Sequence, residues 1–249
     1  MKSKSRGEKI NMAIAIVKKE EMKAIYNDGF AKMELLPGSF QGVKNYKCWL
    51  QEKCKISPET YSDKNVIYCF TSGTGYITTE KWARNIEELS FFIPDFDNGE
   101  FTIYATSDLE FLCLTLDMDE KDKQHHDACH TTLPLFIPFS ECREYTQDCT
   151  GPHTRSWQVL SRGEVGRTLL GVVKAIGEGT IEKGHPAVDQ WNYGLDQADF
   201  TLTVDNEKVS HCAGDWNFVP AGLDHSLTAE PGKEVAYIWF ERFVEPLGD

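Results

Sequence analysis

The chain repeats one arrangement of short apolar runs and turns, once in each half. In the first half, residues 68–79 hold two such runs around a Ser-Gly-Thr-Gly turn, and residues 89–94 add a third run that ends in proline. In the second half, residues 193–204 and 215–220 follow the same order and again end in proline. A further apolar run closes each copy, at residues 110–117 and 234–240. An internal repeat of this kind predicts two copies of one domain.

The runs themselves are typical of β-structure. They are short, rich in β-branched and aromatic residues, and separated by Gly, Pro, Asn and Asp, as in sandwiches and barrels. The 249 residues are enough for two domains of about 100–125 residues each. Short stretches of helical periodicity occur at residues 18–26 and 81–89. We therefore predict an all-β protein, with strands at residues 47–50, 66–71, 75–79, 89–93, 100–105, 110–117, 156–160, 167–175, 190–195, 200–204, 215–219 and 234–240.

One segment of the second half resembles a motif of the cupin family. In the second cupin motif, Gly-Asp opens a strand, Pro-x-Gly makes the following turn, and a histidine comes next. Here these residues are Gly214, Asp215, Pro220, Gly222 and His225. The turn is also sensible in itself, because proline fixes φ and glycine tolerates positive φ.

The first cupin motif is matched in part. It consists of a glycine, five residues, His-x-His, a glutamate and a second glycine, and Gly179 and His185 match its opening. The second histidine falls on Ala187, the second glycine falls on or beside Ala198, and Gln190 stands where the family has glutamate. The resemblance covers residues 165–240 well, while the first half matches only in its pattern of strands and turns.

The resemblance implies a bicupin, that is, two consecutive cupin-type (jelly-roll) β-barrels. We assign residues 12–117 to a degenerate N-terminal barrel, residues 118–152 to a connector, and residues 153–249 to a C-terminal barrel with the candidate site. No histidine precedes His125, so the first barrel has no histidine-rich metal site. We expect aromatic side chains to fill its centre instead, drawn from Tyr68, Phe70, Phe92 and Phe101. In the connector, the apolar residues 133–139 are a candidate additional strand.

For the second barrel, the resemblance implies a metal site made of His185, Gln190 and His225. Imidazole nitrogen and amide oxygen suit a first-row divalent ion such as Mn, Fe, Ni or Zn. Asp189 is the alternative oxygen donor, but neighbouring residues of a strand point to opposite faces, so only one of Asp189 and Gln190 faces the interior. Alternatively, both histidines are ordinary polar residues near a barrel mouth.

Two further residues are candidates for catalysis. Lys183 precedes His185 and offers a positive charge for an anionic substrate; its neighbour Glu182 lies in the same segment. Tyr193 offers a proton or a hydrogen bond. In the alternative interpretation, Lys183 is a solvated loop residue and Tyr193 is a core aromatic. Strand alternation also predicts that Tyr193 faces away from the interior if Gln190 faces into it.

Charge and cysteine content limit the partners and the compartment. The formal net charge of -13 makes nucleic acid and anionic membranes unfavourable partners. No apolar stretch approaches the ~20 residues of a spanning helix. The 8 cysteines form no CxxC pair, and no export signal is evident, so a cytoplasmic location is expected.

The sequence leaves two classes of function open. Bicupins with one site include ureidoglycine aminohydrolases, to which any likeness here is at best distant, as well as dioxygenases, lyases, isomerases and binding proteins, so fold alone does not decide. We favour a metal-dependent enzyme with hydrolase, lyase or isomerase chemistry on a small polar, carboxylate-bearing molecule. The alternative is a non-catalytic cupin that binds or senses a sugar or carboxylate. The apolar edge at residues 133–139 further predicts tight packing between the barrels or a homodimer.

Overall fold

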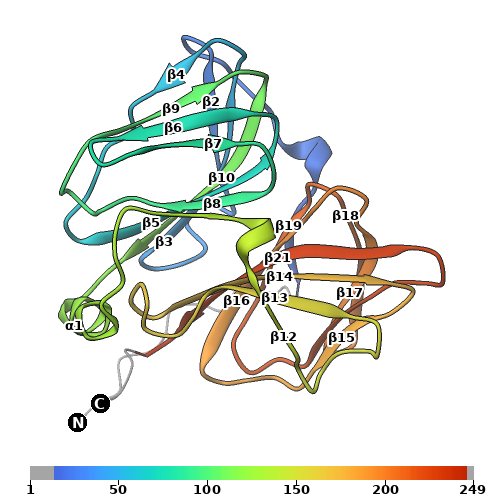
Figure 1. Ribbon diagram of the computed structural model, residues 1–249. Helices are drawn as coiled ribbons and strands as arrows, with labels where there is room; N and C mark the ends of the chain where they lie inside the picture. Colours follow the sequence, from blue (N-terminus) through green and yellow to red (C-terminus); the bar gives the residue numbers. More distant parts are fainter. Residues whose placement is uncertain (1–13, 246–249) are drawn as a thin grey trace.

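The computed structural model describes residues 14–245 and consists of four antiparallel sheets arranged as two units, one above the other in Figure 1. The first unit pairs a six-stranded with a four-stranded sheet. In spatial order the six strands are β11 (Leu135–Pro138), β8 (Ser90–Ile93), β5 (Lys64–Ser72), β10 (Leu109–Asp117), β3 (Val43–Leu50) and β2 (Phe30–Leu35). The four strands are β4 (Lys55–Ile56), β9 (Phe101–Ala105), β6 (Gly75–Thr79) and β7 (Ala83–Ile86).

The second unit pairs a seven-stranded with a four-stranded sheet. The seven strands are β1 (Ala15–Val17), β19 (Trp216–Val219), β16 (Val188–Gly194), β21 (Glu234–Phe243), β14 (Thr168–Ile176), β13 (Arg155–Leu160) and β12 (Arg143–Tyr145). The four strands are β15 (Gly179–Glu182), β20 (His225–Thr228), β17 (Asp199–Val204) and β18 (Glu207–Cys212). The prediction of an all-β chain with two jelly-roll units is therefore confirmed, although each unit has two facing sheets rather than one closed barrel.

Burial patterns follow from the position of each strand. Strand β9 of the four-stranded sheet alternates buried and half-buried residues, because one face of this sheet meets the interior and the other meets solvent. The central strand β5 is buried almost throughout, from Asn65 to Phe70. One of its faces lines the first unit, and the other packs on the second. Residues of both units, including Ile67, Leu114, Leu170 and Phe240, accordingly share one hydrophobic cluster.

The interior of the first unit is filled with aromatic rings, as expected. Tyr68, Phe70, Phe92 and Phe101 are all at most 4% exposed. The Phe101 ring lies 5.0 Å from Phe92 and 5.6 Å from Tyr68, measured between centroids. Phe111 completes the cluster. Among the described residues, the candidate metal cluster lies in the second unit.

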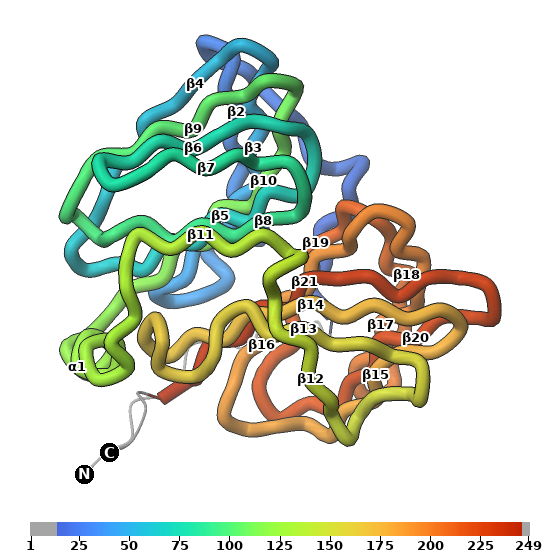
Figure 2. Tube along the Cα trace, in the orientation of Figure 1, coloured from blue at the N-terminus to red at the C-terminus, as the bar shows by residue number. Residues whose placement is uncertain are grey.

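The connections between the units interlock them. Strand β1, near the N-terminus, pairs with β19 of the second unit. Residues 135–138 form β11, which pairs with β8 of the first unit, so the predicted additional strand is present. Figure 2 shows the chain then passing from β11 into β12 of the second unit. Each unit thus includes a strand contributed from outside its own repeat.

Two sequence-based expectations about helices were wrong. Residues 18–26 contain only a 3-10 helix, η1 (Lys19–Glu21), and residues 81–89 contain the strand β7. The α-helix of the described residues is α1 (Glu120–Cys129) in the connector, and a second 3-10 helix, η2, spans Phe139–Glu141. Asp119 caps α1 by accepting hydrogen bonds of 2.9 Å from the amides of Lys121 and Asp122. Because α1 is polar on nearly all sides, it carries no apolar periodicity to reveal it.

Candidate metal centre

The centre begins with two residues that pairing places side by side. Strands β15 and β20 are antiparallel neighbours, and their register sets Glu182 directly opposite His225. Directly opposed residues project to the same face of a sheet. Glu182 Oε2 lies 3.7 Å from His225 Nε2. The facing sheet contributes a second such pair, because β16 and β21 set Gln190 opposite Glu241.

Gln190 connects the two sheets across the interior. Its Oε1 lies 3.1 Å from His225 Nε2, and its Nε2 donates a 2.9 Å hydrogen bond to Asn192 Oδ1. The other ring nitrogen of His225, Nδ1, lies 3.1 Å from the carbonyl oxygen of Leu223. An Nδ1–H that donates to this carbonyl leaves Nε2 facing the cluster, which is the arrangement of many metal-ligating histidines.

His185 enters from the loop between β15 and β16. Its carbonyl accepts a 3.0 Å hydrogen bond from the Gly222 amide, in the Pro-x-Gly turn of the second motif. The loop approaches that turn closely: a Cβ on Gly184 would lie 2.3 Å from the Gly222 oxygen, so this position requires glycine. His185 Nε2 then lies 3.6 Å from Glu182 Oε2 and 3.8 Å from Glu241 Oε1.

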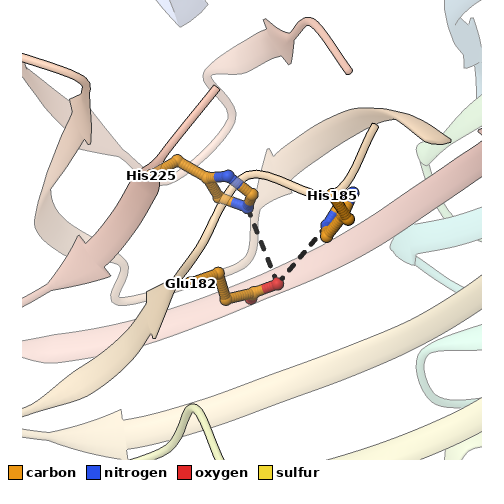
Figure 3. Close-up of side chains that lie close together, drawn as sticks. All are labelled: Glu182, His185 and His225. Carbon is orange, nitrogen blue, oxygen red and sulfur yellow. Dashed lines mark ion pairs between the residues drawn. The ribbon is translucent and has the colours of Figure 1, made fainter. Parts of the chain in front are cut away.

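The three side chains converge as a metal site requires. In Figure 3 the carboxylate of Glu182 lies between the rings of His185 and His225. Their ligand atoms all lie within 4.8 Å of one another. Two donors that are each ~2.1 Å from one ion are separated by roughly 3.0–3.4 Å. The Glu182 oxygen lies 3.6 and 3.7 Å from the two histidine nitrogens, slightly more than this range, and the donor set suits a divalent first-row ion.

Burial gives the centre unusual electrostatics. Desolvation raises the pKa of Glu241 to about 7, against the opposing effect of His185. The carboxylate of Glu182, 3.6 Å away, together with the nearby charge of Glu241, raises the pKa of His185 although burial opposes this. The two partly buried carboxylates beside the imidazoles favour a bound cation.

The structure separates the candidate residues of the sequence into two groups. His185, Gln190 and His225 come together, with Gln190 facing the interior. Asp189 instead accepts a 2.9 Å hydrogen bond from the Ala221 amide.

The two candidate catalytic residues lie elsewhere. Tyr193 faces the first unit, where its hydroxyl accepts a 2.9 Å hydrogen bond from Lys47 Nζ. Lys183 follows β15 and its side chain is exposed. Strand alternation accounts for the position of Tyr193, since Gln190 and Tyr193 are an odd number of residues apart.

The sequence did not identify Glu182 as a ligand or Glu241 as a member of the centre. Glu182 precedes His185 by three residues on the short strand β15, which was not predicted. Glu241 reaches the centre only through the register of β21 with β16. The nearby Glu182 could have been found by testing every Asp and Glu close to the motif histidines. Glu241 carries no such local signal.

Two jelly-roll units in tandem, with a His/Glu cluster inside one of them, define a cupin architecture of the bicupin type. Solved structures agree on this fold. Protein Ylba from E. coli superposes with a TM-score of 0.73 at 12% identity, over 95% of this chain and 93% of that one. The oxalate decarboxylase of Lactobacillus farciminis in complex with formate superposes with a TM-score of 0.68 at 11% identity, over 93% of this chain and 86% of that one. A cupin 2 conserved barrel domain protein from Leptotrichia buccalis superposes with a TM-score of 0.63 at 16% identity, over 94% of this chain and 98% of that one.

The sequence comparisons find less than the structural ones. No protein-family model matches the chain, and no curated protein matches it by sequence. The resemblance to cupins is thus confirmed at the level of the fold. Within residues 14–245, no helix is long and apolar enough to cross a membrane.

Proposed function

We propose that the second unit is the site of a metal-dependent enzyme that acts on a small polar, carboxylate-bearing molecule. Glu182, His185 and His225 would hold the divalent metal, and Gln190 would offer its amide oxygen beside them. The observation that carries the proposal is the convergence of three ligand atoms within 4.8 Å, two of them from motif histidines. The oxalate decarboxylases among the similar folds support the substrate class, since oxalate is a small dicarboxylate.

A bound metal would supply a Lewis acid that polarises a carbonyl or lowers the pKa of a water. The residues of the chain provide substrate access and proton transfer. His185 is one-third exposed, so a substrate approaches from its side of the centre. Glu241 can hold or release a proton near neutral pH, because burial raises its pKa to about 7. A carboxyl group with such a pKa is suited to general acid–base catalysis.

A second candidate function is binding without turnover. It is favoured by Ala187, which stands where the cupin motif has its second histidine, so the centre has two imidazoles rather than three. A metal-loaded barrel of this kind could hold a carboxylate or sugar without reacting with it. The homodimer and the cytoplasmic location also stay predictions.

Metal analysis tests the proposal directly. Protein from cells grown with Mn, Fe, Ni and Zn should contain about one transition metal per chain, as expected for a site with one set of ligands. His185→Ala and His225→Ala should lose most of it, whereas His153→Ala should retain it, because His153 is exposed and is not one of the clustered residues. Wild-type protein without any transition metal would refute the proposal. Turnover of small carboxylates by the loaded protein distinguishes the enzyme from the binding protein.

A further inference from the structure

The interior of the second unit contains buried polar side chains beyond those of the metal centre. One row across the large sheet consists of Trp239, Asn192 and Asn217, which the register of β21, β16 and β19 sets directly opposite one another. His211 reaches this row from β18, and its ring stacks on Phe200 at 4.7 Å. Asn192, Asn217 and His211 have no measurable exposure to solvent.

These buried groups lack the hydrogen bonds that they could form. Asn192 Nδ2, both amide atoms of Asn217, both ring nitrogens of His211 and Trp239 Nε1 have no partner of normal geometry. Asn217 lies beside His211 and raises its pKa as a hydrogen-bonding neighbour, although the contact between them falls short of normal hydrogen-bond geometry. A buried polar group without a partner is destabilising, and a group of them side by side is unusual in a protein interior.

The first unit shows that the fold does not require a polar interior. The corresponding space there is filled by Tyr68, Phe70, Phe92, Phe101 and Phe111, which form a continuous aromatic cluster. Both interiors belong to the same chain and the same kind of jelly roll. The polar row of the second unit is therefore a property of that unit, and a ligand would explain it.

The row is continuous with the metal centre. Gln190 lies one step nearer the mouth on the same face of β16, and it donates to Asn192 Oδ1 while its own oxygen faces His225. A molecule that is held at the centre would therefore extend toward Asn192 and Asn217.

The chemistry of the row selects the kind of group that it would receive. Burial lowers the pKa of His211 to about 4, so the ring is neutral at pH 7. The nearby Asp215 carboxylate is occupied by Lys18 and by the amides of Lys19 and Cys212. A second carboxylate in this dry, uncharged space would lack a counter-charge. A planar amide, by contrast, presents an acceptor beside a donor, as the free side chain of Asn217 requires.

We propose that Asn192, Asn217 and His211 form the inner end of a substrate pocket and bind an uncharged carboxamide group, while the carboxylate of the same molecule is held at the metal centre. This inference rests on the proposed function. Because solvent does not reach the row, the ligand enters from the side of His185, and the two asparagine side chains turn to make room and to bind it.

Oxamate and pyruvate provide a matched pair of probes. They have the same charge and nearly the same shape, but oxamate has an amide NH₂ where pyruvate has a methyl group. Isothermal titration of the Mn²⁺-loaded protein should show oxamate binding at least 10-fold more tightly, because the methyl group leaves buried polar atoms unpaired. Asn217→Leu should lose this preference and keep its metal, while the exposed Asn85→Leu should keep both.

The possible failures are distinguishable. Equal affinity of the wild type for the two probes, or binding of neither while the metal is present, overturns the carboxamide pocket and leaves the metal centre standing. Absence of bound metal overturns the proposed function and this inference together. The wild-type comparison decides even if Asn217→Leu does not fold.

Discussion

Glu241 is a buried carboxyl group whose ionisation opposes folding. Its pKa is about 7 in the folded chain, and a glutamate in an unfolded chain has a pKa of about 4.3. The folded state therefore retains the proton more strongly, so this contribution to stability is full below pH 4 and is lost as the pH rises through 7. The raised pKa of His185 acts in the same direction.

We therefore expect Glu241→Gln to stabilise the metal-free protein at pH 8, by about 1–3 kcal/mol, and to have a much smaller effect at pH 5. Urea unfolding at both pH values measures this. The exposed Glu207→Gln serves as the control and should change little at either pH. An equal effect of Glu241→Gln at both pH values would show that burial does not raise the pKa of this carboxyl group in the folded protein.

The residue scale also shows which parts of the centre could be predicted. His185 and His225 lie in recognisable motifs, and alternation along one strand was sufficient to relate Gln190 to Tyr193. Glu241 could not be placed, because its position depends on how β21 aligns with β16, and the register of two strands distant in sequence is set by tertiary packing.

At the level of elements, every strand predicted from apolar runs is present, because long buried strands carry a strong pattern. The strands that were missed are short or lie at edges, such as β1, β4 and β15. Their few residues carry little pattern, and pairing with a neighbour determines them. Glu182 was missed for the same reason, because it is the last residue of the short strand β15.

One carboxylate helps to hold β1 on the second unit, in addition to its pairing with β19. Asp215 accepts hydrogen bonds of 2.9 Å from Lys18 Nζ, the Lys19 amide and the Cys212 amide, and its side chain is 2% exposed. The aspartate of the cupin motif therefore secures the turn before β19 and the segment that follows β1.

We expect Asp215→Ala to destabilise the protein by about 2–4 kcal/mol, because it leaves buried donors unpaired. Hydrogen exchange should quicken in β1 beyond the global change. Asp199→Ala is a suitable control: it removes a surface ion pair with Lys233 in which both side chains are about half exposed, and it should cost less than about 1 kcal/mol. Equal losses for the two variants would contradict the role given to Asp215.

At the level of the whole molecule, the contact between the units was the hardest feature to foresee. Lys47 lies within an apolar strand and would be expected at the surface, yet its side chain is 3% exposed. It forms a 2.8 Å ion pair with Glu110 and donates to Tyr193 of the second unit. A buried lysine with such partners fixes how the units sit on each other, in addition to the shared hydrophobic cluster.

Removing Glu110, which leaves the Lys47 charge without its partner, should therefore lower the free energy of unfolding more than replacing Lys47 does. Glu110→Ala leaves the Lys47 charge buried beside neutral hydroxyls, and we expect a loss of about 1–3 kcal/mol, which allows for the partial exposure of Glu110. Lys47→Met replaces the charge with an apolar side chain of similar length and should cost less than about 1 kcal/mol. Adding Lys47→Met to Glu110→Ala should recover most of the loss.

Urea unfolding followed by tryptophan fluorescence and by far-ultraviolet circular dichroism tests this ordering. The two signals should coincide in the wild type, because one hydrophobic cluster joins the units and makes them unfold together. In Glu110→Ala, the weakened contact should lower the midpoint for both signals. The exposed pair of Lys64 and Asp117 gives the control, since Lys64→Met should leave the midpoint nearly unchanged. If Lys47→Met proves more damaging than Glu110→Ala, the lysine acts through its hydrogen bond to Tyr193 rather than as a charge that needs its partner.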